Sequence, residues 1–252
     1  MSSELLKEVT SPEETAAIVC DTLKSKGIDV VLTGGSCMEI YTNSNFSSYD
    51  LDFIPNPAQK TTKIKDVMLS MGFKEEGRYF KHPENNYYVE FPTGPVNLGN
   101  EFPSIHNELK TYVGKLVLLT PTNCVKDRLC AFIYHKGNEC FSQAIAVAHI
   151  NDVDKNDLSN WAKKESNEME VTVKKLWEDI EFLNKPITNE VIKSYLKTKE
   201  ISHNVNIDIQ SEFEELTDDL IEDYIIYKLL DVEMGDDENY YMKMNLLYSQ
   251  IS

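Results

Sequence analysis

The sequence predicts an α+β protein in which a mixed α/β half of about 120 residues precedes an all-helical half. Short β-branched or alternating runs, which are typical of strands, concentrate before Pro121. After that proline, long segments repeat apolar residues at helical spacing. The 252 residues suffice for one large domain or two small ones, and we place the boundary between residues 1–119 and 120–252.

The first half alternates helices and strands. Ser11 can cap a helix that begins at Pro12, because Glu14 completes a capping box, and Gly27 should end it. The other expected elements are a strand over 28–33, a helix over 36–42, a strand over 48–54, a helix over 61–72, a hairpin around Glu76-Gly77, a strand over 86–92 and one or two short strands within 109–120.

The second half carries only helical patterns. The expected helices span 123–136, 139–150, a segment from Asp157 or Ser159 through Trp161, 171–183 and 212–230. The segment 234–239, with the sequence MGDDEN, should be an acidic loop. We therefore expect an α-helical bundle after the sheet.

The composition is that of an ordinary globular protein, with 41% hydrophobic and 27% charged residues. The first residues lack the apolar core of a signal peptide, and no run is long enough for a membrane helix. The five cysteines are odd in number and follow no disulfide framework. These features indicate a cytoplasmic protein with free thiols and no membrane partner.

The net charge of −17 is distributed unevenly, since residues 151–252 hold 24 acidic and 11 basic residues. An acidic surface repels phosphate backbones, so we expect no tight binding to extended nucleic acid. The acidic half is either a solvated face or a docking surface for a basic protein partner.

Two carboxylates interrupt a predicted strand shortly after a glycine pair. Side chains alternate along a strand, so Asp50 and Asp52 should point to the same face, roughly 7 Å apart. Their mutual repulsion would be relieved by divalent cations such as Mg²⁺, which also bind substrate phosphates. Gly34 and Gly35 would let the backbone approach a phosphate closely, and Ser36 could donate a hydrogen bond to it.

The segment LTGGS, followed after thirteen residues by Asp-Leu-Asp, resembles the signature of the DNA polymerase β-like nucleotidyltransferase superfamily. It is most similar to the minimal bacterial members, including the abortive-infection toxin-like branch. The resemblance implies a small mixed sheet flanked by helices. It also implies two Mg²⁺ (or Mn²⁺) ions with Asp50 and Asp52 as shared catalytic ligands, and an NTP whose triphosphate lies on Gly34, Gly35 and Ser36.

The same resemblance suggests three further site residues. A third catalytic and metal-binding carboxylate is expected on a neighbouring strand, and Glu90 in YYVEFP is the candidate, with a solvated strand residue as the alternative. Lys126 and Arg128 in the helix after the sheet would bind the nucleotide phosphates, with surface side chains as the alternative. The likeness spans about residues 15–150, and the last hundred residues carry no signature.

The resulting functional hypothesis is a metal-dependent nucleotidyltransferase. It would move an NMP from an NTP to an acceptor hydroxyl with release of pyrophosphate. The acceptor stays open between an RNA end, a protein hydroxyl and a small molecule. The alternative is a degenerate nucleotide- or protein-binding module, which could belong to a toxin–antitoxin or phage-defence system whose acidic helical half docks a partner.

Overall fold

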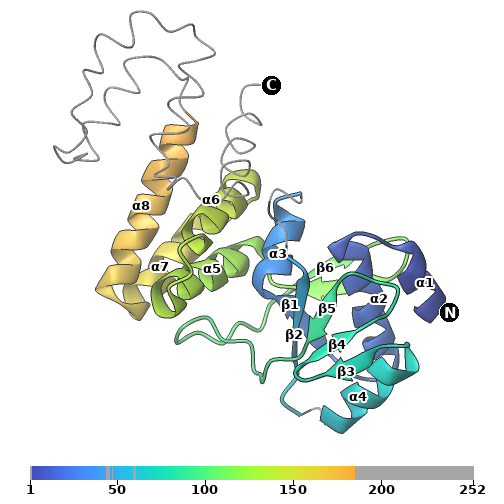
Figure 1. Ribbon diagram of the computed structural model, residues 1–252. Helices are drawn as coiled ribbons and strands as arrows, with labels where there is room; N and C mark the ends of the chain where they lie inside the picture. Colours follow the sequence, from blue (N-terminus) through green and yellow to red (C-terminus); the bar gives the residue numbers. More distant parts are fainter. Residues whose placement is uncertain (1, 44–45, 47, 59–60, 185–252) are drawn as a thin grey trace, which may run out of the picture. The chain divides into compact units, whose positions relative to one another are not determined.

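The computed structural model describes residues 2–43, 46, 48–58 and 61–184 (Figure 1). The elements are, in chain order, α1 (Ser2–Glu8), α2 (Pro12–Ser25), β1 (Val30–Thr33), α3 (Gly34–Tyr41), β2 (Asp50–Pro55), α4 (Thr61–Ser70), β3 (Lys74–Glu76), β4 (Tyr79–Lys81), β5 (Tyr88–Glu90), β6 (Asn107–Lys110), β7 (Lys115–Leu118), α5 (Pro121–His135), α6 (Cys140–Ile150), α7 (Lys155–Glu165) and α8 (Asn167–Leu183). The fold is therefore α+β, as the sequence predicts.

The seven strands form one mixed sheet in the order β3-β4-β5-β2-β1-β7-β6. The central strands β1 and β2 are antiparallel, whereas β5 pairs with β2 and β7 pairs with β1 in parallel. The predicted hairpin around Gly77 forms β3 and β4. Where one or two short strands were expected within 109–120, the antiparallel pair β6 and β7 forms. This topology puts β2 between β1 and β5, so residues from three distant segments meet on one sheet face.

One face of the sheet supplies the core. Leu32 pairs with Phe53, and Leu51 pairs with Val89, and all four side chains are fully buried. Helix α2 contacts β1 and β7, and it also contacts α4. Because side chains alternate along a strand, the neighbouring residues Thr33, Asp52 and Glu90 point to the opposite face.

Helix boundaries mostly follow the expected caps. The Ser11 hydroxyl accepts a hydrogen bond from the Glu14 N–H, and the helix ends before Gly27, whose φ is +72°. Helix α1 was not expected, because its seven residues show too little apolar periodicity. Helix α3 begins at Gly34 rather than at Ser36, so the strand β1 passes directly into it.

Beyond Leu118, every element in the described part of the chain is a helix, as predicted. Helix α3 contacts both the strands β1 and β2 and the helices α5 and α6, and α5 also contacts α7. The described residues up to Leu176 belong to one compact unit. The helix expected over 212–230 and the loop expected over 234–239 lie outside the described residues, and the domain boundary at 119/120 stays a prediction.

None of the described helices combines the length and the apolar character needed to cross a membrane.

Candidate functional site

The passage from β1 into α3 is built around the two glycines. Gly34 has a φ of +72°, a conformation that other residues adopt only with strain. A Cβ atom on Gly34 would lie 2.5 Å from Asp52 Oδ2, and one on Gly35 would lie 2.8 Å from Ser48 Oγ. The missing side chains therefore leave room for Asp52 and Ser48, and Asp52 lies directly against the start of α3.

Three carboxylates gather on the face of the sheet opposite the core. Asp52 on β2 is the register partner of Glu90 on β5, and Asp50 lies two residues before Asp52 on the same side. Asp50 is exposed, while Asp52 and Glu90 are partly buried. The sequence spacing predicted that Asp50 and Asp52 share a face, and the strand pairing adds Glu90 to it.

This arrangement changes the acidity of Asp52. Burial, followed by the charges of Glu90, Asp50 and Asp127, raises the pKa of Asp52 to about 6, and the positive charge of Arg128 lowers it only in part. A carboxyl group in this position is destabilised as an anion unless a cation lies nearby. The face therefore attracts positive charge.

Glu90 already has a cationic neighbour. Its carboxylate lies 3.5 Å from Nε of Arg78, whose side chain is largely exposed. An ion pair with one exposed partner is weak and screened by salt. Glu90 can therefore exchange Arg78 for another cation.

Ser36 is placed differently from its neighbours. Its side chain is fully buried, and its hydroxyl donates a 2.5 Å hydrogen bond to the carbonyl oxygen of Asp50. In this arrangement Ser36 holds α3 against β2 and has no donor left for a phosphate. Glu39 supports the same junction, because its carboxylate accepts a hydrogen bond from the Ser48 N–H.

A pocket of about 690 Å³ opens beside Gly34 and Asp52, within the size range of small-molecule sites. It is lined by Thr33, Gly34, Asp52, Ile54, Pro92, Asn97, Gly99, Asn100, Asp127, Arg128, Cys130, Ala131, Tyr134, His135 and Glu165. The lining comes from the sheet, from the loop after β5 and from helices α5 and α7. The sequence did not single out Asp127 or Glu165 as site residues.

Arg128 is the predicted phosphate ligand that reaches this pocket. Its guanidinium lies 2.6 Å from a carboxylate oxygen of Asp127 and also donates to Gln143. Burial lowers the pKa of Arg128, but the charge and hydrogen bonds of Asp127 outweigh it, so the pKa of Arg128 is raised overall. Arg128 is thus a permanent cation whose charge is largely balanced by Asp127.

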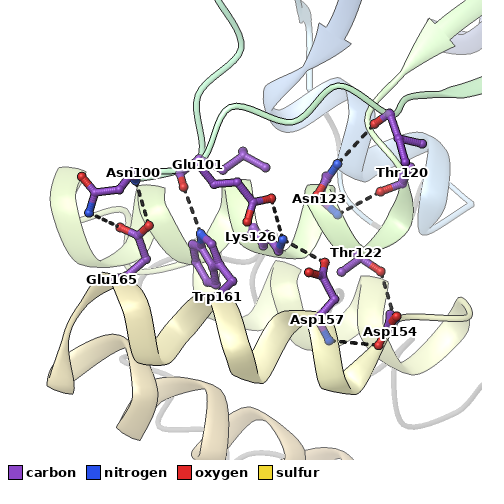
Figure 2. Close-up of polar contacts among 12 residues, drawn as sticks. Asn100, Glu101, Thr120, Thr122, Asn123, Lys126, Asp154, Asp157, Trp161 and Glu165 are labelled. Carbon is purple, nitrogen blue, oxygen red and sulfur yellow. Dashed lines mark hydrogen bonds and ion pairs between the residues drawn. The ribbon is translucent and has the colours of Figure 1, made fainter.

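Lys126 is not among the residues that line the pocket. Its side chain is fully buried, and its ammonium lies 2.8 Å from Glu101 and 2.9 Å from Asp157 (Figure 2). The ammonium also lies 5.8 Å from the ring centroid of Trp161. Lys126 therefore joins the loop after β5 to α7, and its charge is balanced there by the two carboxylates.

The loop residues 97–101 are fastened to α7 by further contacts (Figure 2). The Glu165 carboxylate accepts hydrogen bonds from the backbone N–H and the side-chain amide of Asn100, at 2.8 and 3.0 Å. The Trp161 indole N–H donates to the Leu98 carbonyl at 3.0 Å. These contacts position one wall of the pocket. No local sequence pattern predicts them, because the partners are more than sixty residues apart in the chain.

The donors on the sheet face suit a hard divalent cation. Across the described ranges, no group of three or more His, Cys, Asp or Glu side chains is arranged to hold a metal ion. Mg²⁺, however, is commonly bound by one or two carboxylates together with water and phosphate oxygens. Asp50 and Asp52 supply such a pair, and the pKa of Asp52 is raised first by burial and then by the charges of Glu90 and Asp50.

The chain matches no family model, and comparisons with curated proteins and with solved structures give no match.

Proposed function

We propose that this protein is a metal-dependent nucleotidyltransferase that moves an NMP from an NTP to an acceptor hydroxyl and releases pyrophosphate. The observation that carries the proposal is the set of three carboxylates on one sheet face, of which Asp52 lies against Gly34 at the start of α3 and lines the 690 Å³ pocket. The resemblance of LTGGS and Asp50-Leu51-Asp52 to the nucleotidyltransferase signature supports the same function. On this proposal, the first part of the chain is a nucleotidyltransferase domain and the later helices form a helical domain.

The charges around the pocket explain why such a reaction would need a cation. The pocket wall carries Asp52 and Glu165, whereas Asp127 and Arg128 balance each other's charge. A triphosphate would therefore be repelled by the side chains alone. Mg²⁺ or Mn²⁺ on Asp50 and Asp52 would neutralise this charge and the charge of the phosphates.

The residues of the chain would then have distinct roles. Asp50 and Asp52 would hold the cations, and the backbone N–H groups at the start of α3 would face the phosphates. The acceptor oxygen would bond to the α-phosphorus as the bond to the β-phosphate oxygen breaks, and the hydroxyl proton would pass to a carboxylate of the sheet face. Arg128 would contact the phosphates on the α5 side.

A second candidate, a nucleotide-binding module without turnover, is favoured by the placement of Ser36 and Lys126. Both were expected on the phosphates, and both are instead fully buried and hydrogen-bonded within the protein. A site without these two donors would bind a nucleotide but transfer it slowly or not at all.

Labelling with nucleotides separates the two candidates. The protein is incubated with each α-³²P-labelled NTP, with Mg²⁺ or Mn²⁺ and a cell extract, and the labelled products are separated. The nucleotidyltransferase proposal predicts label in an acceptor, dependent on the metal and abolished by Asp50→Asn with Asp52→Asn. Asp66→Asn, at an exposed position of α4, serves as the control. Metal-dependent NTP binding without any labelled acceptor would instead establish the binding module.

A further inference from the structure

The sheet face that carries the three carboxylates continues across β5 onto β4. Tyr88 is the register partner of Asp50, and Tyr79 is the register partner of Glu90, so both tyrosines lie on this face. Lys81 pairs with Tyr88 and lies there as well. Neighbouring strands are about 5 Å apart, so β4 lies about 10 Å from the aspartates of β2.

Each of the two tyrosines is paired with a cation. The guanidinium carbon of Arg78 lies 4.7 Å from the centroid of the Tyr79 ring, and the ammonium of Lys81 lies 4.9 Å from that of Tyr88. The two rings contact each other edge to face, with their centroids 5.9 Å apart. These four side chains therefore form one group, called the tyrosine–cation cluster below.

The hydrogen bonds within the cluster leave it rich in donors. Arg78 donates to the Tyr79 hydroxyl, and Lys81 donates to the Tyr88 hydroxyl at 3.2 Å. Because each phenol oxygen acts here as an acceptor, its own O–H hydrogen stays available to a ligand, as do further N–H groups of the two cations. The cluster thus suits a negatively charged ligand that accepts hydrogen bonds, such as a phosphate.

The cluster can be reached from solvent. The side chain of Arg78 is 70% exposed, and the other three members are partly exposed. Lys74, the register partner of Lys81, adds a third basic residue on β3, where Glu76 is the acidic residue of the same face. The outward face of this hairpin is therefore basic, in contrast to the net charge of −17 of the whole chain.

Arg78 connects the cluster to the carboxylates, because its Nε lies 3.5 Å from the carboxylate of Glu90. An anion on the cluster would thus be close to an acceptor hydroxyl at the aspartates. In a single-stranded RNA, the terminal hydroxyl and a phosphate lie within one or two nucleotides, whereas a protein hydroxyl carries no such phosphate. Bases of single strands also stack on tyrosine rings and on guanidinium planes.

We propose that the tyrosine–cation cluster binds the 3′ end of a single-stranded RNA, with phosphates on the two cations and the terminal hydroxyl directed toward Asp50 and Asp52. This inference rests on the proposed nucleotidyltransferase function and names its acceptor. Two phosphate contacts give weak, salt-sensitive binding that is confined to the terminal nucleotides.

Fluorescence anisotropy of a 5′-labelled RNA hexamer tests the binding without any reaction, because no NTP is added. The titration uses the full chain with Mg²⁺ at about 50 mM salt, where weak phosphate contacts are measurable. Arg78→Gln combined with Lys81→Gln should weaken binding about tenfold, as expected for lost charged hydrogen bonds. The same variant should reduce the slope of log affinity against log salt by about 1.4, the value for two phosphate contacts.

A second double variant removes the same charge elsewhere. Lys65 pairs with Glu75 and Lys115 pairs with Glu108, so Lys65→Gln combined with Lys115→Gln should leave the affinity and the salt slope nearly unchanged.

A third variant keeps the rings and the charges. Tyr79→Phe combined with Tyr88→Phe removes only the two hydroxyls, and it should weaken RNA binding about threefold. Circular dichroism checks the fold of every variant, and this conservative change tests the cluster where the loss of the cations unfolds the protein.

The choice of ligands tests which molecule occupies the cluster. A blunt duplex and free AMP should each bind at least about tenfold more weakly than the hexamer, because the duplex hides its bases and AMP offers one phosphate. Equal affinity for either of them, no binding of the hexamer at about 1 mM protein, or equal losses in the two lysine-containing double variants would overturn the proposal.

The outcomes also separate this inference from the proposed function. Transfer of an NMP to some acceptor without any RNA binding would overturn the RNA site and leave the nucleotidyltransferase. RNA binding that depends on the cluster, without transfer to any acceptor, would support the RNA site and contradict the nucleotidyltransferase.

Discussion

Two regions of this molecule bury charge and treat it in opposite ways. In the contact between α5 and α7, the ammonium of Lys126 is fully buried and has two carboxylates within 2.9 Å. On the sheet face, Asp52 is partly buried beside two other carboxylates, and its pKa is raised to about 6. The charge of Lys126 is balanced by carboxylates of the same chain, whereas the carboxylates around Asp52 would be stabilised by a cation from outside the chain.

This difference indicates what each region is for. A buried ion pair with its partners in place fixes geometry. Here it fixes the loop that lines the 690 Å³ pocket beside Gly34 and Asp52, called the carboxylate pocket below. Like charges held together weaken the fold, and such arrangements cluster at sites that bind ions or substrates. The sequence predicts Lys126 and Asp52 in one site. In the structure Lys126 pairs with Glu101 and Asp157 and does not line the pocket beside Asp52.

The strongest test of the comparison removes the partners of Lys126. Glu101→Gln combined with Asp157→Asn should lower the free energy of unfolding by about 4 kcal/mol, because an unpaired ammonium stays buried. Lys126→Met should lower it much less, since an apolar side chain of similar volume leaves no buried charge. Urea denaturation measures both. Glu108→Gln, which breaks an exposed pair with Lys115, is the control and should change little.

If Lys126→Met were as destabilising as the double variant, the buried charge would not be the reason for the loss. The contrast between a compensated charge at Lys126 and an uncompensated charge at Asp52 would then lack its evidence at Lys126.

Gly34→Ala probes the packing of Asp52 against α3. The φ of +72° and the 2.5 Å approach to Asp52 Oδ2 predict a loss of about 3 kcal/mol in unfolding free energy. Gly77 has a similar φ of +65° with no atom within 4 Å, so Gly77→Ala should lose only about 1 kcal/mol. Thermal or urea unfolding compares them, and equal losses would show that Asp52 does not press on Gly34.

Asp52→Asn tests the uncompensated charge through its pH dependence. The folded-state pKa of about 6 lies above the unfolded value near 4, so stability falls as the pH rises from about 4 to about 6. Asn does not titrate. The variant should therefore be more stable than the natural protein at pH 8, by up to about 3 kcal/mol, and the difference should vanish below pH 4.

Urea midpoints at pH 4, 6 and 8 provide the measurement, with Asp66→Asn as an exposed control. A destabilised Asp52→Asn variant at pH 8 would contradict the raised pKa and, with it, the attraction of the sheet face for cations.

The two basic residues of α5 should differ in nucleotide binding, a prediction that rests on the proposed function. Arg128 lines the carboxylate pocket and Lys126 does not. Arg128→Gln should weaken Mg²⁺-dependent NTP binding about tenfold, as expected for a lost charged hydrogen bond, whereas Lys126→Met should leave it unchanged where the protein is folded. Calorimetric titration measures the NTP affinity of both variants. A larger loss of affinity in Lys126→Met than in Arg128→Gln would indicate that Lys126, and not Arg128, binds the phosphates.

The smallest expected effect concerns nucleic acid. Lys126 and Arg128 are both paired with carboxylates, and the chain carries a net charge of −17. We therefore expect no tight binding of tRNA or duplex at about 150 mM salt without Mg²⁺. Submicromolar affinity in a gel-shift series would mean that a basic surface forms elsewhere in the chain.

Much of the fold follows from local sequence patterns. Ser11 with Glu14 marks the start of α2. Helix α5 was expected from residue 123 and begins at Pro121, where Thr120 caps it through the Asn123 N–H. The alternation of Asp50, Leu51 and Asp52 was enough to assign which side chains lie together. Such features depend on residues a few positions apart, so one sequence is sufficient to predict them.

The candidate site was predictable only in part, because several of its contacts join residues that are far apart in the sequence. The spacing of Asp50 and Asp52 defines their common face, but the pairing of Asp52 with Glu90 depends on strand order. Glu165 lies 65 residues from Asn100, and their contact has no local signal. The burial of Ser36 also follows from packing, because its hydroxyl on α3 donates a hydrogen bond to the Asp50 carbonyl on β2.

By itself, the sequence determined the alternation of elements, the helix caps, the paired aspartates and the acidic balance, because each arises from neighbouring residues or from composition. The tertiary structure alone decided whether a charge is compensated. Lys126 and Asp52 are both ordinary ionisable residues in the sequence, and only long-range packing surrounds one with opposite charges and the other with like charges. Electrostatic energy depends on distance and burial in space, and neither quantity is encoded in local spacing.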